Sequence, residues 1–237
     1  MKKILFCWLA GLSCCGILSG AQTCPDRTVP EGFVSLFDGK TLDGWDGDAK
    51  FWSVQEGCIV GHSTPENVVP HNSFLILRQF EKPYHFELRV DFKMSKNANS
   101  GLSFRAQETA SKPWNILGRH ADIYDNPKHL ATLYHNGVLA WRGQKVELNA
   151  QGKPEKVETF ADAKDLLEKI DLYGWNQFRI LVEGRTYTLW INDVKMAEVT
   201  ENASVQPPQG VLGFQMHQGP PMTIQLKNIF FREIKEK

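Results

Sequence analysis

The chain has 237 residues, of which 42% are hydrophobic and 23% are charged. Its 27 lysines and arginines balance 27 aspartates and glutamates, so it lacks the basic excess of a nucleic-acid-binding surface, and no nucleic-acid partner is expected. The length is sufficient for a large hydrophobic core, and all-β sandwiches of this size are often one domain.

Residues 1–21 have the pattern of a signal peptide. Lys2 and Lys3 precede an apolar run at 4–18, and small residues of the kind that signal peptidase recognises follow. We therefore expect a periplasmic or secreted protein. A retained anchor and lipidation are the alternatives, because Leu12–Cys15 loosely resembles a bacterial lipobox. No second apolar stretch of about eighteen residues follows, so no transmembrane segment is expected in the mature chain.

The rest of the chain is predicted to be a lead-in at 22–30 and a single domain at 31–237, since no repeat or low-complexity segment divides it. Short strand-like runs alternate with turn signals, which is typical of a sandwich or barrel. The run 86–94 alternates cleanly between apolar and charged residues, which predicts a strand with one wet face.

The two cysteines outside the leader, Cys24 and Cys58, leave two alternatives open. In an oxidising compartment they pair, and otherwise they remain separate thiols. Two cysteines alone do not have the spacing of a metal site.

The run 99–108, NSGLSFRAQE, predicts a strand entered through a turn. Strict alternation places Arg105 and Gln107 on the face opposite Phe104 and Ala106. Alternation alone leaves open whether this polar face meets water or lines a pocket.

The C-terminal half also predicts strands. Hairpin turns are expected at 183–185 and 192–193, where glycine and an Asn-Asp pair tolerate positive φ. Only residues 162–170 have the periodicity of a helix. The residues therefore predict one all-β domain with a short helix in a long connection.

Several spaced motifs resemble the family of 3-keto-disaccharide hydrolase domains, formerly a domain of unknown function. They are EGFVSLFDGKTLDGW, FWSVQEGCIVG, FELRVDFKM, NSGLSFRAQE, YGWNQFRILVEG and LKNIFFREI, and the match spans about residues 31–234. The resemblance implies a two-sheet antiparallel jelly-roll sandwich of the concanavalin A-like lectin and glucanase type. It also implies hydrolysis of glycosides oxidised to a ketone at sugar carbon 3.

Further motifs, STPEN, LAWRGQK and MHQGPPM, indicate one subgroup of that family. The chain departs from the family pattern at GRHADIYDN. Where many members have a glutamate or glutamine before the aspartate, this sequence has His120 before Asp122.

A ketone at carbon 3 acidifies the hydrogen on carbon 2. A base can remove that hydrogen, an enolate forms, the group on carbon 1 leaves by elimination, and water adds. This route needs a base, a donor for the enolate oxygen and an acid for the leaving group. It does not need the two opposed carboxylates of ordinary glycosidases, and the E-x-D-x-x-E motif of sandwich-fold glucanases is absent from the sequence.

Two polar pairs are candidates for this chemistry. His120 and Asp122 share a strand face, so they form an oriented base or supply two ligands to a metal; the alternative is a solvated polar pair. Gln215 and His217 share a face before a rigid Gly-Pro-Pro turn, which suits a base or acid at a rim. The alternative for His217 is a hydrogen-bonded structural histidine.

Arg105 carries five fixed donors that suit a sugar hydroxyl or an enolate oxygen, and its alternative role is an ion pair on the outer face, such as one with Asp122. Trp141 is a candidate stacking platform for a sugar. The full set of substrate-binding candidates is Glu66, Gln107, Glu108, Tyr134, His135, Trp141, Arg142 and Gln215.

The leading hypothesis is an exported enzyme that cleaves 3-keto-glycosides by base-catalysed elimination and hydration. The alternatives are a non-catalytic carbohydrate-binding module and an ordinary glycosidase that uses Glu66 and Glu108. No cofactor is required by the motifs, and a divalent metal is left open. No nucleotide-binding glycine motif occurs, so a separate oxidoreductase is expected to supply the 3-keto sugar.

Overall fold

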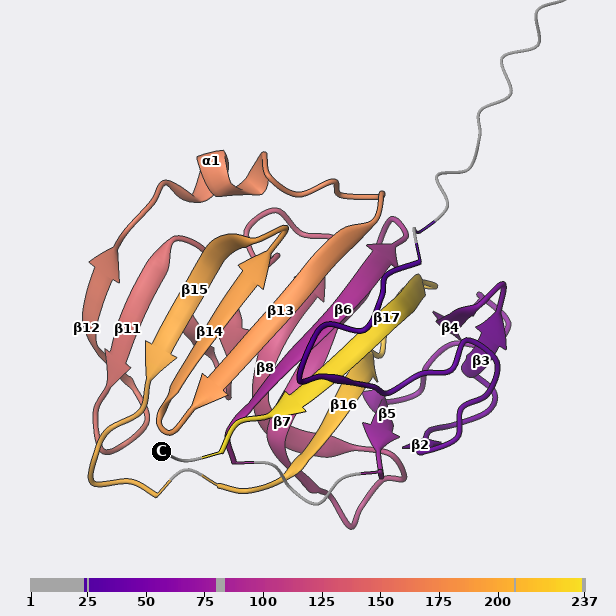
Figure 1. The fold of residues 1–237 in the computed structure, drawn as a ribbon, viewed down its shortest axis with the longest axis horizontal. Helices are drawn as coiled ribbons and strands as arrows, with labels where there is room; N and C mark the ends of the chain where they lie inside the picture. The colour runs from indigo at the N-terminus through magenta and orange to yellow at the C-terminus, as the bar shows by residue number, and fades with distance from the viewer. Residues whose placement is uncertain (1–23, 25, 80–83, 207, 236–237) are drawn as a thin grey trace, which may run out of the picture.

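The computed structural model describes residues 24, 26–79, 84–206 and 208–235, so the expected signal peptide lies outside the described residues. Strands dominate these residues and form two facing sheets (Figure 1). The described residues contain a single short helix, α1 (Ala163–Leu167), which is capped by Asp162. The prediction of an all-β jelly-roll sandwich with one short helix is confirmed. No helix in the described part of the chain is long and apolar enough to cross a membrane.

The larger sheet contains ten strands, which run across the front of Figure 1. Its neighbours pair antiparallel except β11 and β15, which run parallel. The order across the sheet is β12 (Pro154–Thr159), β11 (Gln144–Leu148), β15 (Val194–Thr200), β14 (Thr186–Ile191), β13 (Asn176–Glu183), β6 (Phe86–Met94), β17 (Thr223–Glu233), β4 (Cys58–His62) and β3 (Trp52–Gln55), with β1 (Val34–Ser35) also paired to β17.

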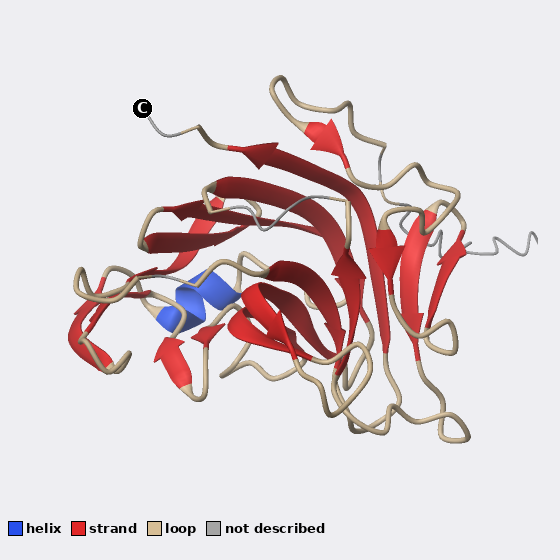
Figure 2. Cartoon of the chain, turned by 90° about the horizontal axis from the view of Figure 1, so that it is seen from below, coloured by secondary structure: helices blue, strands red, loops and turns tan. Residues whose placement is uncertain are grey.

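The smaller sheet contains seven strands, and Figure 2 shows the two sheets as stacked layers. All of its pairs are antiparallel. The order is β10 (Val138–Ala140), β9 (Leu133–Tyr134), β8 (Ile116–Tyr124), β7 (Asn99–Glu108), β16 (Val211–Met216), β5 (Ser73–Leu77) and β2 (Trp45–Asp46).

The hairpin turns fall where the sequence predicts them. Asn192 and Asp193, between β14 and β15, have φ of +51° and +60°, and Gly184, between β13 and β14, has φ of +57°. Two consecutive residues with positive φ form the turn whose twist matches the flanking strands. The Asn-Asp pair therefore fixes the β14–β15 hairpin.

The core lies between the sheets and ties them together. Phe86 of β6 lies 6.3 Å, ring centre to ring centre, from Phe104 of β7 in an edge-on contact, and all three of Phe86, Phe104 and Phe214 are fully buried. Burial of such a side chain contributes about 1.5–3 kcal/mol. Because side chains alternate along a regular strand, the residues directly before and after a core residue of the smaller sheet point to its outer face.

The outer face of β6 is not the wet face that its alternation predicts. Glu87 is only 1% exposed and forms ion pairs with Arg89, Arg179 and Arg232. The guanidinium groups of Arg89 and Arg232 both lie 4.7 Å from the ring centre of Phe33, which covers them. Charged residues here are buried because chain segments remote in sequence cover them.

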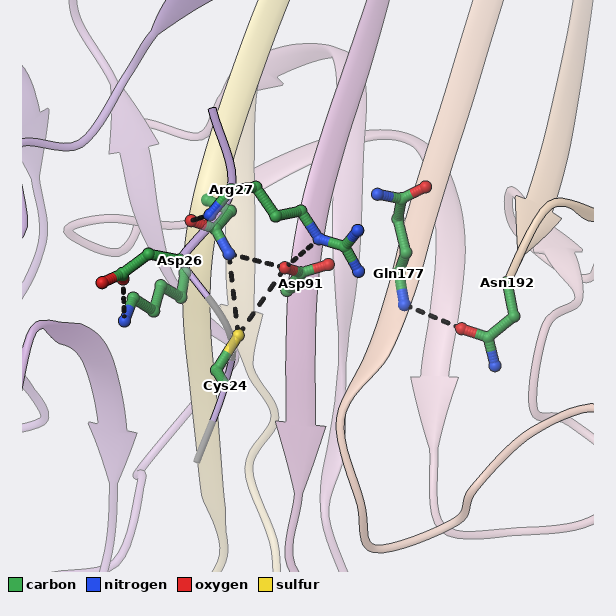
Figure 3. Close-up of polar contacts among 8 residues, drawn as sticks. Cys24, Asp26, Arg27, Asp91, Gln177 and Asn192 are labelled. Atoms are coloured by element: carbon green, nitrogen blue, oxygen red, sulfur yellow. Dashed lines mark hydrogen bonds and ion pairs between the residues drawn. The ribbon is translucent and has the colours of Figure 1, made fainter. Parts of the chain in front are cut away.

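The lead-in covers a second part of that face. The Oδ2 atom of Asp91 accepts hydrogen bonds from Arg27 Nε at 2.7 Å and Asn228 Nδ2 at 2.6 Å, and Cys24 Sγ lies 3.6 Å from it (Figure 3). Of the two described cysteines, Cys24 and Cys58, neither is in a disulfide. The start of the described chain is thereby held against β6 and β17, on the other sheet from the cavity described next.

Candidate functional site

A cavity of about 320 Å³ opens on the outer face of the smaller sheet. Strands β5, β7, β8 and β16 and the loops beside them contribute its walls. The polar side chains that line the cavity include Ser103, His120, Asp122, Tyr134, His135, Gln215 and His217.

Regular alternation brings the two predicted polar pairs into this cavity. His120 and Asp122 project from β8 while Ala121 between them is fully buried in the core. Gln215 projects from β16, and His217 follows the end of that strand. The expectation that each pair shares a face is confirmed, and both pairs meet at one site.

His120 is held from one side only. Its Nδ1 atom lies 2.9 Å from Ser103 Oγ. Its Nε2 atom lies 3.3 Å from Asp122 Oδ1, but the alignment is poor and Nε2 is left without a hydrogen-bond partner. Gly101 makes room for the ring, since its φ is +151° and a Cβ there would lie 2.4 Å from Nε2. The Nε2 atom of His120 is therefore buried against Gly101 without a hydrogen-bond partner.

Asp122 is oriented by a residue that the sequence motifs do not reveal. Thr132 Oγ1 donates a 2.5 Å hydrogen bond to Asp122 Oδ2, and the Asp122 N–H donates to the Thr132 carbonyl at 3.0 Å. Asp122 is only 9% exposed. The carboxylate is thus fixed with its other oxygen towards His120.

His135 has a defined tautomer. Its Nδ1 atom lies 2.7 Å from the carbonyl oxygen of Gly118, and because a carbonyl only accepts, Nδ1 carries a proton. Burial lowers the pKa of His135 below its ordinary value, with the nearby positive charge of Arg119 acting in the same direction. The ring is therefore neutral at pH 7, and its Nε2 atom accepts a long hydrogen bond of 3.4 Å from Asn136 Nδ2.

His217 has the same tautomer for the same reason. Its Nδ1 atom lies 2.5 Å from the Gln218 carbonyl, and its backbone N–H donates to the Asn99 carbonyl at 3.2 Å. The residue is solvent-accessible and stands at the rim.

Arg105 does not face the cavity, and the strict alternation expected for β7 is wrong at this point. The pairing of β7 with β8 shifts between Phe104 and Gln107, and Arg105 has φ of +49°, which marks a β-bulge. The bulge reverses the alternation. Arg105 therefore turns between the sheets, while Ala106 joins a small apolar cluster with Phe74 on the cavity side.

The Arg105 side chain is fully buried among groups that compensate its charge. It donates to the carbonyls of Tyr84 and Gly184, and its Nη1 atom lies 3.9 Å from Glu201. Glu201 in turn accepts a 2.6 Å hydrogen bond from Arg119. The alternative expected for Arg105, an ion pair with Asp122 on the outer face, is therefore wrong as well, because the carboxylate nearest to Arg105 is that of Glu201.

Three of the predicted binding residues line the cavity and the others lie away from it. Tyr134, His135 and Gln215 are part of the lining. Gln107 donates to the Gln209 carbonyl instead, Glu66 is exposed in a loop outside the cavity, and both carboxylate oxygens of Glu108 accept from Arg78.

The hairpin residues Trp141 and Arg142 also lie outside the cavity lining. Trp141 packs against the ring of His129 at 5.3 Å, so it supports a lining residue. Arg142 is buried and donates to the carbonyls of Pro127, Leu130 and Ala163, which fixes the loop after β8.

Other lining residues are not singled out by the motifs. Ser103 and Thr132 act on the predicted pair, and period-two alternation from Leu102 is the one signal that places Ser103 outward. The additional polar or aromatic lining residues are Asn72, Asn99, Asn115, Tyr124, His129 and Asn136. Most of these come from loops, where periodicity gives no direction.

In the part of the chain that the structure describes, no group of three or more histidine, cysteine or acidic side chains is placed to hold a metal ion. His120 and Asp122 together offer two ligands at most. The chemistry below is accordingly derived from the side chains themselves.

Comparison with known proteins identifies the family of the chain. Residues 32–235 match the model of the 3-keto-alpha-glucoside-1,2-lyase-like domain. A curated relative from Bacteroides thetaiotaomicron, named 3-keto-disaccharide hydrolase, is 31% identical over 113 residues, which cover 42% of this chain and 39% of the relative. The match thus spans well under half of that protein.

Solved structures share the fold at low identity. A putative glycosyl hydrolase from Parabacteroides distasonis is 18% identical with a TM-score of 0.54, covering 86% of this chain and 95% of its own. The carbohydrate-binding module CBM66 from Bacillus subtilis is 16% identical with a TM-score of 0.52, covering 80% and 95%. A Bacillus subtilis protein with a galectin-like fold is 13% identical with a TM-score of 0.52, covering 83% and 92%. Together with the match over residues 32–235, this fold places the chain in the 3-keto-alpha-glucoside-1,2-lyase-like domain family.

Proposed function

We propose that this protein cleaves glycosides whose sugar carries a ketone at carbon 3, by elimination across carbons 1 and 2 followed by addition of water. The observation that carries the proposal is the meeting of three histidines, His120, His135 and His217, with Asp122 in one cavity. The family description and the name of the curated relative support the substrate class.

The reaction balances without an external oxidant. A base takes the proton from carbon 2, and the electron pair delocalises onto the ketone oxygen as an enolate. The pair then returns to form the double bond between carbons 1 and 2, while the bond from carbon 1 to the leaving oxygen breaks. The departing oxygen takes a proton, and water adds across the double bond to give the free 3-keto sugar.

His135 is assigned as the base. Its Nδ1 proton is committed to the Gly118 carbonyl, and its lowered pKa keeps it unprotonated at pH 7. The exposed Asn136 amide, which donates to Nε2 at 3.4 Å, must give way to the substrate hydrogen. A positioned general base contributes about 10²–10⁴-fold in rate.

His120 is assigned as the donor to the enolate oxygen. The His120 ring lines the cavity, and a proton on Nε2 would sit 3.3 Å from the fixed carboxylate of Asp122, so the ring must turn out of its buried position to reach the enolate oxygen. His217, on the accessible rim, is assigned as the acid that protonates the departing oxygen.

The cavity is ill-suited to an ordinary glycosidase. That mechanism needs two carboxyl groups flanking the glycosidic bond. Asp122 is the one carboxylate among the described residues that line this cavity. Glu66 and Glu108, the pair considered for such a mechanism, lie elsewhere, and Glu108 is held by Arg78.

The proposal extends to the cellular setting. The leader pattern at residues 1–21 supports export to the periplasm or secretion, and the 3-keto substrate implies a separate oxidoreductase that oxidises the sugar beforehand. Mass spectrometry of the protein purified from a bacterial periplasm would test export. A mature chain beginning near residue 22 is expected, and an intact leader or an acylated cysteine would contradict simple secretion.

Activity on matched substrates tests the reaction. The protein is expected to release p-nitrophenol from p-nitrophenyl 3-keto-glucoside and not from the unoxidised glucoside. In D₂O it is also expected to exchange the carbon-2 hydrogen of 3-keto-1,5-anhydroglucitol, which has no leaving group. His135→Gln should lower both rates by about 100-fold or more. Equal cleavage of the unoxidised glucoside, or micromolar sugar binding without turnover or exchange, would overturn the proposal in favour of a glycosidase or a binding module.

A further inference from the structure

A second, smaller cavity of about 220 Å³ adjoins the first. The two share three lining residues, Asn99, Tyr124 and His217. Pockets that bind small ligands usually measure about 300–1,000 Å³, so the second cavity is too small for a ligand of its own. The two cavities are better described as two parts of one groove.

His217 stands in the wall between these parts. Its ring is fixed through Nδ1 to the Gln218 carbonyl, and its backbone N–H is fixed to Asn99, which also belongs to the shared wall. A substrate that fills both cavities therefore passes this imidazole. The bond nearest to it is the one that joins the two parts of the substrate.

The second cavity has the chemistry of a site for an uncharged ring rich in hydroxyls. Its amides, Asn97 and Gln218, both donate and accept, and Tyr124 offers an aromatic face. Pro220 and Met222 supply apolar surface for the ring carbons. Such a mixture of amide groups and apolar faces suits a sugar.

The same groove is unsuited to anions. Among the described residues, no lysine or arginine lines either cavity, whereas Asp122 lines the first and Asp125 the second. The Asp125 carboxylate is held in place, since Oδ2 accepts from the Asn97 N–H at 2.7 Å and Oδ1 from the Tyr173 hydroxyl at 3.1 Å. A carboxylate or phosphate on the ligand would meet two fixed negative charges without a counter-charge.

We propose that the second cavity is the leaving-group subsite, that it takes an uncharged sugar ring, and that it discriminates against anionic leaving groups such as uronic acids and sugar phosphates. This rests on the proposed function, because the first cavity then holds the 3-keto ring. His217 lies where the departing oxygen of carbon 1 passes from one cavity to the other. Because Nδ1 keeps its proton for the Gln218 carbonyl, the ring must enter the step as the doubly protonated imidazolium, and it gives the Nε2 proton to that oxygen.

Two variants of the second cavity test the subsite. Gln218→Ala and Asn97→Gly each remove an amide that belongs to this cavity alone, and glycine preserves the positive φ of +63° at position 97. Loss of a hydrogen bond worth about 1 kcal/mol should lower kcat/KM for a 3-keto glucosyl-glucose disaccharide five- to tenfold, with the change chiefly in KM. For methyl 3-keto-glucoside the change should stay below about twofold, because the methyl group does not reach the second cavity.

Gln177→Ala removes an amide from β13 of the other sheet and is the matched control. It should leave kcat/KM unchanged for both substrates. If Gln218→Ala and Asn97→Gly lower kcat/KM equally for both substrates, or do not lower it for the disaccharide, the assignment of the subsite is wrong. If the wild-type protein cleaves neither substrate, the proposed function fails instead. Calorimetry with the unoxidised disaccharide then still decides the subsite, since Gln218→Ala must weaken binding for the inference to stand.

The charge preference has its own comparison. A 3-keto glucosyl-glucuronic acid should be cleaved at least about tenfold less efficiently than the 3-keto glucosyl-glucose, and the difference should shrink as salt screens the repulsion. Asp125→Asn should reduce the difference in cleavage efficiency between the neutral and the anionic disaccharide. Equal efficiency for the neutral and anionic disaccharides would overturn the charge selection while leaving the position of the subsite intact.

Discussion

The carbonyl oxygen of Gly118 lies 2.7 Å from Nδ1 of His135, and this one contact decides which nitrogen of the imidazole can act as a base. Gly118 belongs to β8, the strand that also carries the predicted pair His120 and Asp122. The same strand therefore supplies both side chains of that pair and the backbone group that orients His135.

The pH dependence of activity should follow from the lowered pKa of His135. The base works only when neutral, so the contribution of His135 is present at pH 7 and is lost as the pH falls through that pKa. The acidic limb of kcat/KM, which reports the free enzyme, should therefore lie below the ordinary histidine value of about 6.5. A limb at or above that value, or an unchanged limb in His135→Gln, would contradict the assignment.

Thr132→Val should lower kcat about tenfold or more with little change in fold. The substitution keeps the shape of the side chain and removes the 2.5 Å hydrogen bond to Asp122. Hydrogen bonds to charged groups contribute about 1.5–3 kcal/mol, and the freed carboxylate would no longer be fixed towards His120. Thr186→Val removes a threonine hydroxyl from the other sheet and serves as the control in steady-state kinetics. Equal kinetics for the two variants would show that Asp122 needs no such support.

Gly101→Ala should destabilise the protein more than Gly219→Ala does. The two glycines have nearly the same φ, +151° and +147°, so both substitutions carry a similar backbone penalty. A Cβ at Gly101 would also lie 2.4 Å from the Ala121 carbonyl, whereas nothing lies within 4 Å of one at Gly219. The free energy of unfolding, measured in urea, should fall by about 1–3 kcal/mol more for Gly101→Ala. Equal losses would mean that the site relaxes around the methyl group.

Glu87→Gln should reduce the free energy of unfolding at pH 7 by about 3 kcal/mol, because it leaves a set of arginines without their shared carboxylate. Burial alone would raise the pKa of Glu87, but the hydrogen bond from Arg89 and the charge of Arg179 outweigh it and hold the pKa below its ordinary value. The stabilisation is thus present above the ordinary glutamate pKa of about 4.3 and is lost as the pH falls through the lowered one.

Urea unfolding at several pH values checks this, with the exposed Glu155→Gln on β12 as the control. The difference between wild type and Glu87→Gln should shrink in acid. A difference that is independent of pH would point to lost packing rather than lost charge.

Cys24 should react slowly with thiol reagents at pH 8. Burial, and then the charge of Asp91, raises the pKa of its thiol to about 12, so little thiolate is present. Asp91→Asn should speed the reaction, which can be followed with a chromogenic disulfide in a Cys58→Ser background. An unchanged rate would show that the lead-in does not rest on Asp91 in solution.

Sequence periodicity gave the two polar pairs the correct strand face where the strands are regular. His120 and Asp122 flank a core alanine, and Gln215 precedes a core methionine, so alternation was enough to give them a common face. The all-β class followed from the same periodicity and from the spacing of turns, whereas the jelly-roll sandwich was implied by the family resemblance. Neither inference required knowledge of distant contacts.

The failures share a different physical origin. The bulge at Arg105 needs a positive φ, which arginine rarely adopts, so nothing local indicates it. Thr132 reaches Asp122 from a loop, and Glu87 is buried by arginines from β13 and β17, so both depend on tertiary contacts. Strand alternation predicts exposure only when the strand is regular and no other segment covers its outer face. Arg105 lies in an irregular strand, and Glu87 lies on a covered face.

The turned-in Arg105 has a mechanical consequence for the whole sandwich. Its guanidinium group reaches from β7 across the interior to the carbonyl of Gly184, in the turn between β13 and β14 of the opposite sheet. Apolar contacts between stacked sheets resist separation but have little directional resistance to shear. The hydrogen bond from Arg105 on β7, the neighbour of β8, to the opposite sheet resists such sliding. The bulge that takes Arg105 away from the cavity therefore also stabilises the position of β8, which carries His120 and Asp122.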